Sequence, residues 1–214
     1  IMKRLDHKKV LNFWYEGVKS VWPEATTYTN ETSLGIPPVP QRWFNGGEKT
    51  DEYINKNFKD YVEELSKQNS KVRKEWAKEA NSHLAAIIVL DQFTRNIYRN
   101  SAQAFAADDI AVGMTKEMLE NGQYDELEGT VYKNFAIMPL MHAEDIDLQN
   151  LCVAMFKAMK EKAPEEDHKN IDFSIKFAVD HRDRIQQFGR FPHRNDVLGR
   201  ESTKEEREHF EKHG

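Results

Sequence analysis

The sequence predicts an all-α protein built from stacked antiparallel helix pairs. Apolar residues recur every three to four positions through most of the 214 residues, which is the period of an amphipathic helix. No segment alternates apolar and polar residues in the way that a half-buried strand does. Short links join the periodic segments, so consecutive helices are expected to pack as antiparallel neighbours.

The first helix is expected over residues 6–21, with Asp6 as its N-cap and Pro23 after its end. The next segment, residues 24–41, is rich in Thr, Asn and Pro. Its three closely spaced prolines exclude a helix, because proline lacks the backbone N–H and clashes with the preceding turn. We therefore expect this segment to be an insertion on the surface.

Seven further helices follow, and several have a recognisable start or end. The pair Asn121-Gly122 ends one helix, Pro139 suits the first turn of another, and Ser202 with Glu205 matches a capping box. The expected ranges are residues 49–65, 72–98, 102–121, 125–137, 139–160, 164–189 and from 202 onward. We expect all of them to belong to one domain over residues 1–214.

The composition indicates a soluble globular protein, with 39% hydrophobic and 31% charged residues. No apolar run approaches the ~20 residues of a membrane helix, so no membrane contact is expected. A net charge of -5 disfavours nucleic acid as a partner. The single cysteine, Cys152, excludes an internal disulfide and fits a cytoplasmic location. The oligomeric state stays open.

The third expected helix carries polar side chains where burial is expected. From Leu84 onward its first half is apolar on every side, which is typical of a central helix. At about 100° per residue, Asp91, Arg95 and Arg99 fall on one side, with Asn96 beside them. A buried charge needs a partner, because losing one costs about 3–5 kcal/mol. An Asp91–Arg95 pair explains two of these residues and leaves the others unexplained.

Histidines and arginines also lie on the apolar faces of two later helices. In the helix that follows Pro164, His181 and Arg184 fall within a stripe that is expected to face the core. That stripe comprises Phe173, Phe177, Ile185 and Phe188. In the helix expected to start at Pro139, His142 and Asp145 share one side, but two ligands are too few for a metal site. We therefore expect no metal and no cofactor.

The loop over residues 190–201 is crowded with hydrogen-bonding side chains, among them His193, Arg194, Asn195 and Arg200. It has few apolar residues to bury. Two interpretations are open: the loop is solvated, or it closes over a polar pocket on the helices.

Several motifs resemble the signatures of a family known as domain of unknown function 924. They are "VLNFWYEG", "RWF" followed by "DEYINKNF", "LDQFTRNIYRNSAQAFAAD", "FAIMPLMHAED" and "FGRFPHRNDVLGREST", and they follow one another along nearly the whole chain. The resemblance implies a helical fold similar to tetratricopeptide repeats, and it implies no particular activity. Members usually carry Ser where this chain has Ala143, so one hydroxyl beside His142 is absent here.

The motifs that carry the resemblance also contain the polar residues singled out above. We expect one connected cluster that includes Asp91, Arg95, Asn96, His181 and His193. The arginines outnumber the carboxylates expected there, which are Asp91, Glu144 and Asp145. An excess of buried cation is costly, and a bound anion would relieve it.

Three classes of function follow from this cluster. The leading hypothesis is binding of a small anionic ligand or a peptide carboxylate, because Arg and His donors suit carboxylate and phosphate. The alternatives are an enzyme that uses His142, Glu144 or His181 as general acid or base, and a structural or interaction protein without chemistry. The expected ligand-binding residues are Asp91, Arg95, Asn96, Arg99, Asp145, Arg184, His193, Arg194, Asn195 and Arg200.

Overall fold

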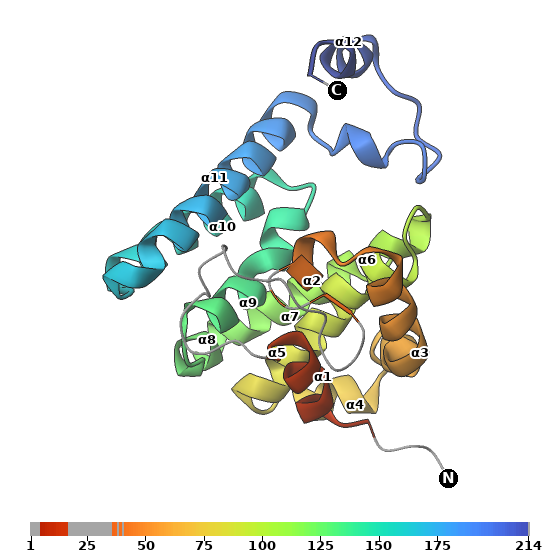
Figure 1. The fold of residues 1–214 in the computed structure, drawn as a ribbon. Coiled ribbons are helices and arrows are strands. Elements are labelled where there is room, and N and C mark those ends of the chain that lie inside the picture. Colours follow the sequence, from red (N-terminus) through yellow and green to blue (C-terminus); the bar gives the residue numbers. More distant parts are fainter. Residues whose placement is uncertain (1–4, 17–35, 38, 40, 214) are drawn as a thin grey trace.

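The computed structural model describes residues 5–16, 36, 37, 39 and 41–213, and every regular element in these residues is a helix (Figure 1). The elements are α1 (His7–Trp14), α2 (Gln41–Asn45), α3 (Gly47–Leu65), α4 (Lys71–Trp76), α5 (Ala80–Ile88), η1 (Val89–Phe93), α6 (Thr94–Ile97), η2 (Ala102–Phe105), α7 (Asp108–Glu120), α8 (Gln123–Glu126), α9 (Thr130–His142), α10 (Ile146–Lys162), α11 (Glu165–Phe188), η3 (Pro192–Arg194) and α12 (Lys204–His213). The expected all-α class with packed helix pairs is confirmed. None of the described helices is long and apolar enough to cross a membrane.

The main core lies where α1, α3, α5 and α9 meet. Trp14 on α1 packs its ring against Phe93 and Phe135, with ring centroids 5.4 and 5.5 Å apart. The segment from Leu84 to Leu90 is completely buried, as its all-round apolar sequence predicts. This helix therefore forms the centre of the molecule, and residues near its end are held rigidly.

A second group of buried residues joins α9, α10 and α11. In Figure 1, α10 and α11 lie side by side and project from one side of the other helices. The chain then turns at Gly189, whose φ of 68° suits glycine. Residues 189–213, which we call the C-terminal segment, lead through η3 to α12 at the top of the view.

The helix expected over residues 72–98 is in fact interrupted. It breaks between Trp76 and Ala80, where Glu79 is extended. The released carbonyls are bound by side chains: Ser82 Oγ donates to Trp76 O at 2.6 Å, and Gln123 Nε2 donates to Ala77 O at 3.1 Å. These hydrogen bonds satisfy backbone carbonyls that the break leaves without a partner in the helix. Further on, the helix widens into the π-helical η1 before α6.

The boundary expected at Pro139 is also wrong, because this proline lies inside α9. The chain becomes extended only at Ala143, and the next helix begins at Ile146. Asp145 is its N-cap and accepts from Asp147 N and Leu148 N at 2.9 and 3.1 Å. Elsewhere, the helix expected over residues 102–121 starts as the 3-10 turn η2 and continues as α7, and residues 125–137 are divided between α8 and α9.

Both ends of the chain show smaller differences. Asp6 caps α1 by accepting from Lys8 N at 2.9 Å, as expected, while residues 17–35, which contain most of the expected insertion, lie outside the described residues. Ile36 and Val39 are buried, so this end of the insertion is not on the surface. The last helix is capped by Thr203 and Glu206, one residue later than the expected capping box.

The apolar stripe expected to bury α11 is partly wrong as well. Phe173 and Phe177 are 54% and 45% exposed. The residues of α11 that face its neighbours are Ile171, Ser174, Ala178 and Ile185. The prediction of a single domain over residues 1–214 stays a prediction.

Candidate functional site

Asp91 is the central residue of the site. It lies in the π-helical turn η1 and is 1% exposed. Its carboxylate is bound on both oxygens, by His142 Nδ1 at 2.7 Å and by Gln92 Nε2 at 2.5 Å. Arg95 Nη1 lies 3.3 Å from the same carboxylate. Single π turns inside α-helices are frequent at functional sites, and here the turn places Asp91 opposite the end of α9.

The Asp91–His142 pair has a defined charge state. Burial raises the pKa of Asp91, but His142, Arg95 and two hydrogen bonds outweigh it, so the pKa falls well below its usual range. Burial lowers the pKa of His142 more than the Asp91 carboxylate raises it. A neutral imidazole then donates its Nδ1–H to Asp91. Its Nε2 has no hydrogen-bond partner in the described residues, and the side chain is 17% exposed.

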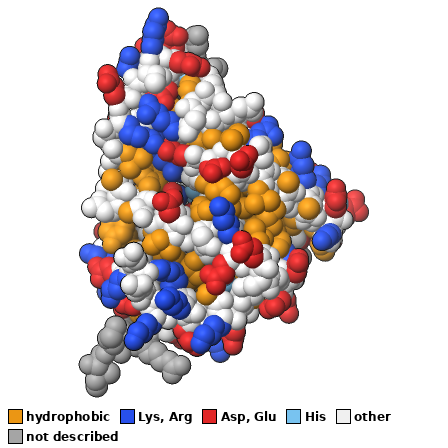
Figure 2. Space-filling view, turned by 180° about the vertical axis from the view of Figure 1, so that it is seen from behind, with side chains coloured by type: hydrophobic (Ala, Val, Ile, Leu, Met, Phe, Trp, Pro, Cys, Tyr) orange, Lys and Arg blue, Asp and Glu red, His pale blue; other side chains and the backbone are white. Residues whose placement is uncertain are grey.

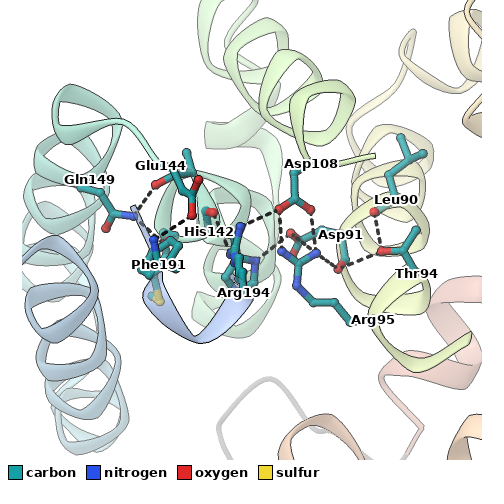
Figure 3. Close-up of polar contacts among 12 residues, drawn as sticks. Leu90, Asp91, Thr94, Arg95, Asp108, His142, Glu144, Gln149, Phe191 and Arg194 are labelled. Atoms are coloured by element: carbon teal, nitrogen blue, oxygen red, sulfur yellow. Dashed lines mark hydrogen bonds and ion pairs between the residues drawn. The ribbon is translucent and has the colours of Figure 1, made fainter. Parts of the chain in front are cut away.

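A second carboxylate, Asp108 at the start of α7, joins two arginines. Arg95 donates to it twice, at 2.9 and 3.0 Å, and Arg194 of η3 lies 3.3 Å away (Figure 3). The Arg194 guanidinium lies between the rings of Phe105 and Phe191, 4.5 Å from each centroid. Its Nη2 also donates to the His142 carbonyl at 3.0 Å. Arg194 therefore fastens the C-terminal segment to η2, α7 and α9.

Glu144, just after α9, extends the network into the C-terminal segment. It accepts from Phe191 N at 2.7 Å and from two nitrogens of Arg200 at 2.6 and 2.9 Å. Arg200 in turn donates to Asn195 Oδ1 at 3.0 Å. Asn195 then donates to Glu206 at 3.1 Å. The loop is therefore packed against the helices, and the solvated interpretation is wrong.

Glu206 of α12 closes the network. Two nitrogens of Arg190 donate to its carboxylate at 2.7 and 2.9 Å. These bonds, with the backbone N–H of Thr203, lower the pKa of Glu206 to about 2. The hydrogen bonds thus run without interruption from Asp91 to the last helix.

The expected excess of buried cation is absent from this network. Each of its arginines faces a carboxylate: Arg95 and Arg194 contact Asp108, Arg200 contacts Glu144, and Arg190 contacts Glu206. The expectation counted Asp145, which caps α10 instead, and it omitted Asp108 and Glu206. An anion is therefore not needed to neutralise the buried arginines.

Two of the expected residues belong to a separate cluster. Asn96 and Arg99 both donate to Asp51 of α3, at 2.8 Å and at 2.6 and 2.8 Å. The prediction that Asn96 joins Asp91 is wrong, because the Asn96 amide donates to Asp51 on α3 instead. The Asp51 cluster fastens α6 to α3 and is half exposed.

Two histidines, His181 and His193, lie against the ring of Phe191 at the outer side of the network, and His142 lies next to His181. The His181 and His193 rings lie 5.4 and 5.5 Å from the Phe191 ring, and His181 lies 6.4 Å from His142. His181 Nδ1 donates to Phe177 O at 2.8 Å, and its Nε2 has no hydrogen-bond partner among the described residues. We call His142, His181, His193 and the neighbouring Arg184 the imidazole edge.

Two side chains of the imidazole edge, Arg184 and His193, are exposed and make no hydrogen bond within the part of the chain that the structure describes. Neither of them forms an ion pair with a described residue. Within the part of the chain that the structure describes, no three His, Cys, Asp or Glu residues could hold a metal ion. Two hollows, of about 540 and 420 Å³, lie elsewhere on the surface, and neither is lined by a residue of the imidazole edge.

The imidazoles of the edge are expected to resist protonation. Burial lowers the pKa of His142 and His181, and burial with the charges of Arg194 and Arg184 lowers the pKa of His193 to about 4. A free imidazole titrates at about 6.5. Between these two pH values the unfolded chain binds more protons than the folded one. The contribution of a neutral His193 to stability is therefore complete above about pH 6.5 and is lost as the pH falls toward about 4, and the lowered pKa values of His142 and His181 act in the same direction.

An NMR titration of the ring resonances of the eight histidines tests this. We expect the His193 midpoint near pH 4, and a flatter dependence of stability on pH in the variant His193→Gln. Glu144 and Glu206 stay ionised in this range, because arginine partners lower their pKa. A His193 midpoint at or above about 6.5 would contradict the prediction.

Comparison with known proteins places the chain among proteins whose activity is unassigned. The profile of a family described as "Bacterial protein of unknown function (DUF924)" matches residues 10–214. The chain is also similar to the solved structure of a protein of unknown function, ATU0120 from Agrobacterium tumefaciens. The two are 26% identical with a TM-score of 0.75, and the match covers 96% of this chain and 97% of the other. No match was found among curated proteins.

Proposed function

The chain belongs to the DUF924 family of bacterial proteins of unknown function, and for this member we propose that it binds a small anionic molecule, a carboxylate or a phosphate, at the imidazole edge. One observation carries the proposal. The arginines of the buried network all have carboxylate partners, whereas the guanidinium of Arg184 and the neighbouring imidazole Nε2 atoms have no partner among the described residues. Guanidinium donors of this kind suit carboxylate and phosphate oxygens.

Proton uptake is expected to accompany binding. The neutral His142 and His181 rings use their Nδ1–H groups for Asp91 and for Phe177 O. Their free Nε2 atoms are then acceptors, and they become donors to an anion only when protonated. An anion in turn favours the charged imidazole and raises its pKa. The affinity should therefore increase as the pH falls from about 7.5 to about 6, where protonation costs less.

Calorimetric titration with inorganic phosphate and with succinate at these two pH values tests the proposal. We expect millimolar or tighter binding at about pH 6, weaker binding at about pH 7.5, and uptake of protons. Arg184→Ala should weaken binding about tenfold or more, the usual contribution of a charged hydrogen bond. Arg182→Ala is the matched control, because Arg182 lies on the same helix and pairs with Asp183 at 2.6 Å.

Two results count against the proposal. If neither phosphate nor succinate binds at millimolar concentrations at either pH value, the network has a purely structural role, and the protein is a structural or interaction protein without chemistry. Equal loss in the Arg184 and Arg182 variants would indicate a general effect of surface charge.

General acid–base catalysis is the second candidate, and the Asp91–His142 pair favours it. A buried carboxylate that holds Nδ1–H while Nε2 faces solvent is the arrangement by which enzymes orient a general base. Glu144 is a poor candidate for this role, because Arg200 and Phe191 N occupy its oxygens. The histidine titration tests this candidate, since a base near pH 7 requires a neutral His142 with its proton on Nδ1, and a His142 ring that stays charged at pH 7 would exclude it.

A further inference from the structure

One face of α11 combines an apolar ledge with part of the imidazole edge. Phe173, Phe177, His181 and Arg184 follow one another at spacings of four, four and three residues. At about 100° per residue these four positions fall within about 80° of each other around the helix. The two phenylalanine rings contact each other, with centroids 4.6 Å apart. They form what we call the phenylalanine ledge, and it leads along the helix to His181 and Arg184.

The phenylalanine ledge is exposed although the buried face of the same helix is close by. Phe173 and Phe177 are among the exposed large hydrophobic residues, whereas Ser174 and Ala178 beside them are buried. Figure 2 shows hydrophobic side chains gathered over the middle of the molecule on the face turned away in Figure 1. Lys176 and Asp180, both exposed, lie along the outer border of the ledge. An apolar centre with a charged border is the composition of a protein–protein interface.

We propose that this face of α11 binds the C-terminal tail of a partner protein, with the terminal carboxylate at the imidazole edge and apolar side chains on the phenylalanine ledge. The inference rests on the proposed function, because the carboxylate takes the place of the anion. Charge complementarity assigns the direction of the tail: the unpaired Arg184 and the histidines lie at one end, and the apolar contacts lie at the other.

The geometry of the helix gives the spacing of the partner residues. With a rise of about 1.5 Å per residue, Phe177 and Phe173 lie about 10 and 16 Å along the axis from Arg184. An extended peptide advances about 3.3 Å per residue. Apolar side chains about three and five positions before the C-terminal residue therefore reach the ledge. Because side chains alternate in an extended chain, both of these residues point to the same side.

A peptide suits this open face better than a simple alkyl carboxylate does. The two prominent hollows do not include the phenylalanine ledge, so an alkyl chain lying on it would keep one side in water. An extended peptide covers the rings with its apolar side chains and turns its backbone and remaining polar groups to solvent. Its backbone can also reach the charged side chains at the border of the ledge.

Fluorescence anisotropy with dye-labelled octapeptides tests the inference. The probe is Gly-Ser-Leu-Ser-Leu-Ser-Gly-Ser with a free C-terminal carboxylate, and it is compared with its C-terminal amide and with a version in which both Leu are Ser. We expect about tenfold weaker binding for the amide, since a charged contact is lost. About tenfold weaker binding is also expected for the Ser version, which loses the apolar burial.

Three variants of the protein assign the effects to residues. Phe173→Ala with Phe177→Ala should reduce binding of the Leu peptide to that of the Ser peptide and leave phosphate binding unchanged. Arg184→Ala should weaken both the peptide and phosphate. Leu151→Ala is the matched control, because Leu151 is 40% exposed on α10 and lies outside this stripe. The replaced side chains are all exposed, so the variants are expected to fold. Circular dichroism of each variant checks that its helix content is unchanged.

The outcomes separate this inference from the proposed function. Equal binding of the Leu and Ser peptides overturns the inference, and so does unchanged peptide binding in the phenylalanine variant. If phosphate still binds in these cases, the proposed anion site stands without the peptide. Equal binding of the free acid and the amide overturns it as well. If neither phosphate nor peptide binds, both proposals fail.

Discussion

Replacing Asp91 with alanine is expected to lower the free energy of unfolding by about 3 kcal/mol or more. The reason is that a buried charge pair is broken on one side only, which costs about 3–5 kcal/mol. The variant leaves the Nδ1–H of His142 without its acceptor and removes one of the two carboxylates beside Arg95. Arg95 keeps Asp108, which places the expected loss at the lower end of that range.

Urea unfolding of the wild type and the variant measures this effect. Asp172→Ala is the control, because Asp172 is an exposed partner of Lys160 on the surface. An exposed pair contributes less than about 1 kcal/mol. A loss below about 1 kcal/mol for Asp91→Ala would show that solvent reaches the site and that the pair is not structurally buried.

The helical class and most helices could be predicted from the sequence, because the apolar period is a local property of each segment. The breaks could not be predicted in the same way. Those after Trp76 and after His142 depend on side chains that bind the freed carbonyls, and two of these come from other helices. Gln123 binds Ala77 O, and Gln149 binds Met141 O and Ala143 O. Such contacts exist only once the helices have packed.

The candidate site could be predicted in part for a related reason. Asp91, Arg95 and His142 were recognisable because polar residues on apolar faces require partners. Asp108 and Glu206 were missed, since acidic residues in the first turn of a helix already have a local explanation in the helix dipole. The π turn left no signal in the apolar pattern, and Asp51, the partner of Asn96, lies on a different helix.

The prediction that Phe173 and Phe177 of α11 face the core was wrong for a different reason. Phe173 and Phe177 have the four-residue spacing of a core stripe, and apolar spacing alone does not distinguish a face that packs within the chain from one that is available to a partner. The side of α11 that packs within the chain carries small residues instead, Ser174, whose hydroxyl donates to Asn134 Oδ1 of α9 at 2.9 Å, and Ala178. The exposed phenylalanines are therefore informative only when the structure is known.

Replacing Phe191 with alanine is expected to detach the C-terminal segment while the rest of the fold stays intact. Phe191 is completely buried, and its ring lies against Arg194, His181 and His193. Removing a buried phenylalanine side chain costs about 3–5 kcal/mol. The segment is otherwise held by a polar network that contributes less per contact. Because the main core lies around α5, the loss should appear as local opening of the segment.

Amide hydrogen exchange distinguishes local opening from global unfolding. The amides of Leu198 and Arg200, which donate to Arg194 O and Asn195 O at 3.0 and 2.8 Å, report on the segment. Their protection should fall about 100-fold or more, the equivalent of about 3 kcal/mol, while amides of α5 change little. Phe177→Ala is the matched control, because its ring is exposed. An equal loss of protection in α5 would show that the segment unfolds only with the core. No loss at Leu198 and Arg200 would show that the polar network holds the segment without Phe191.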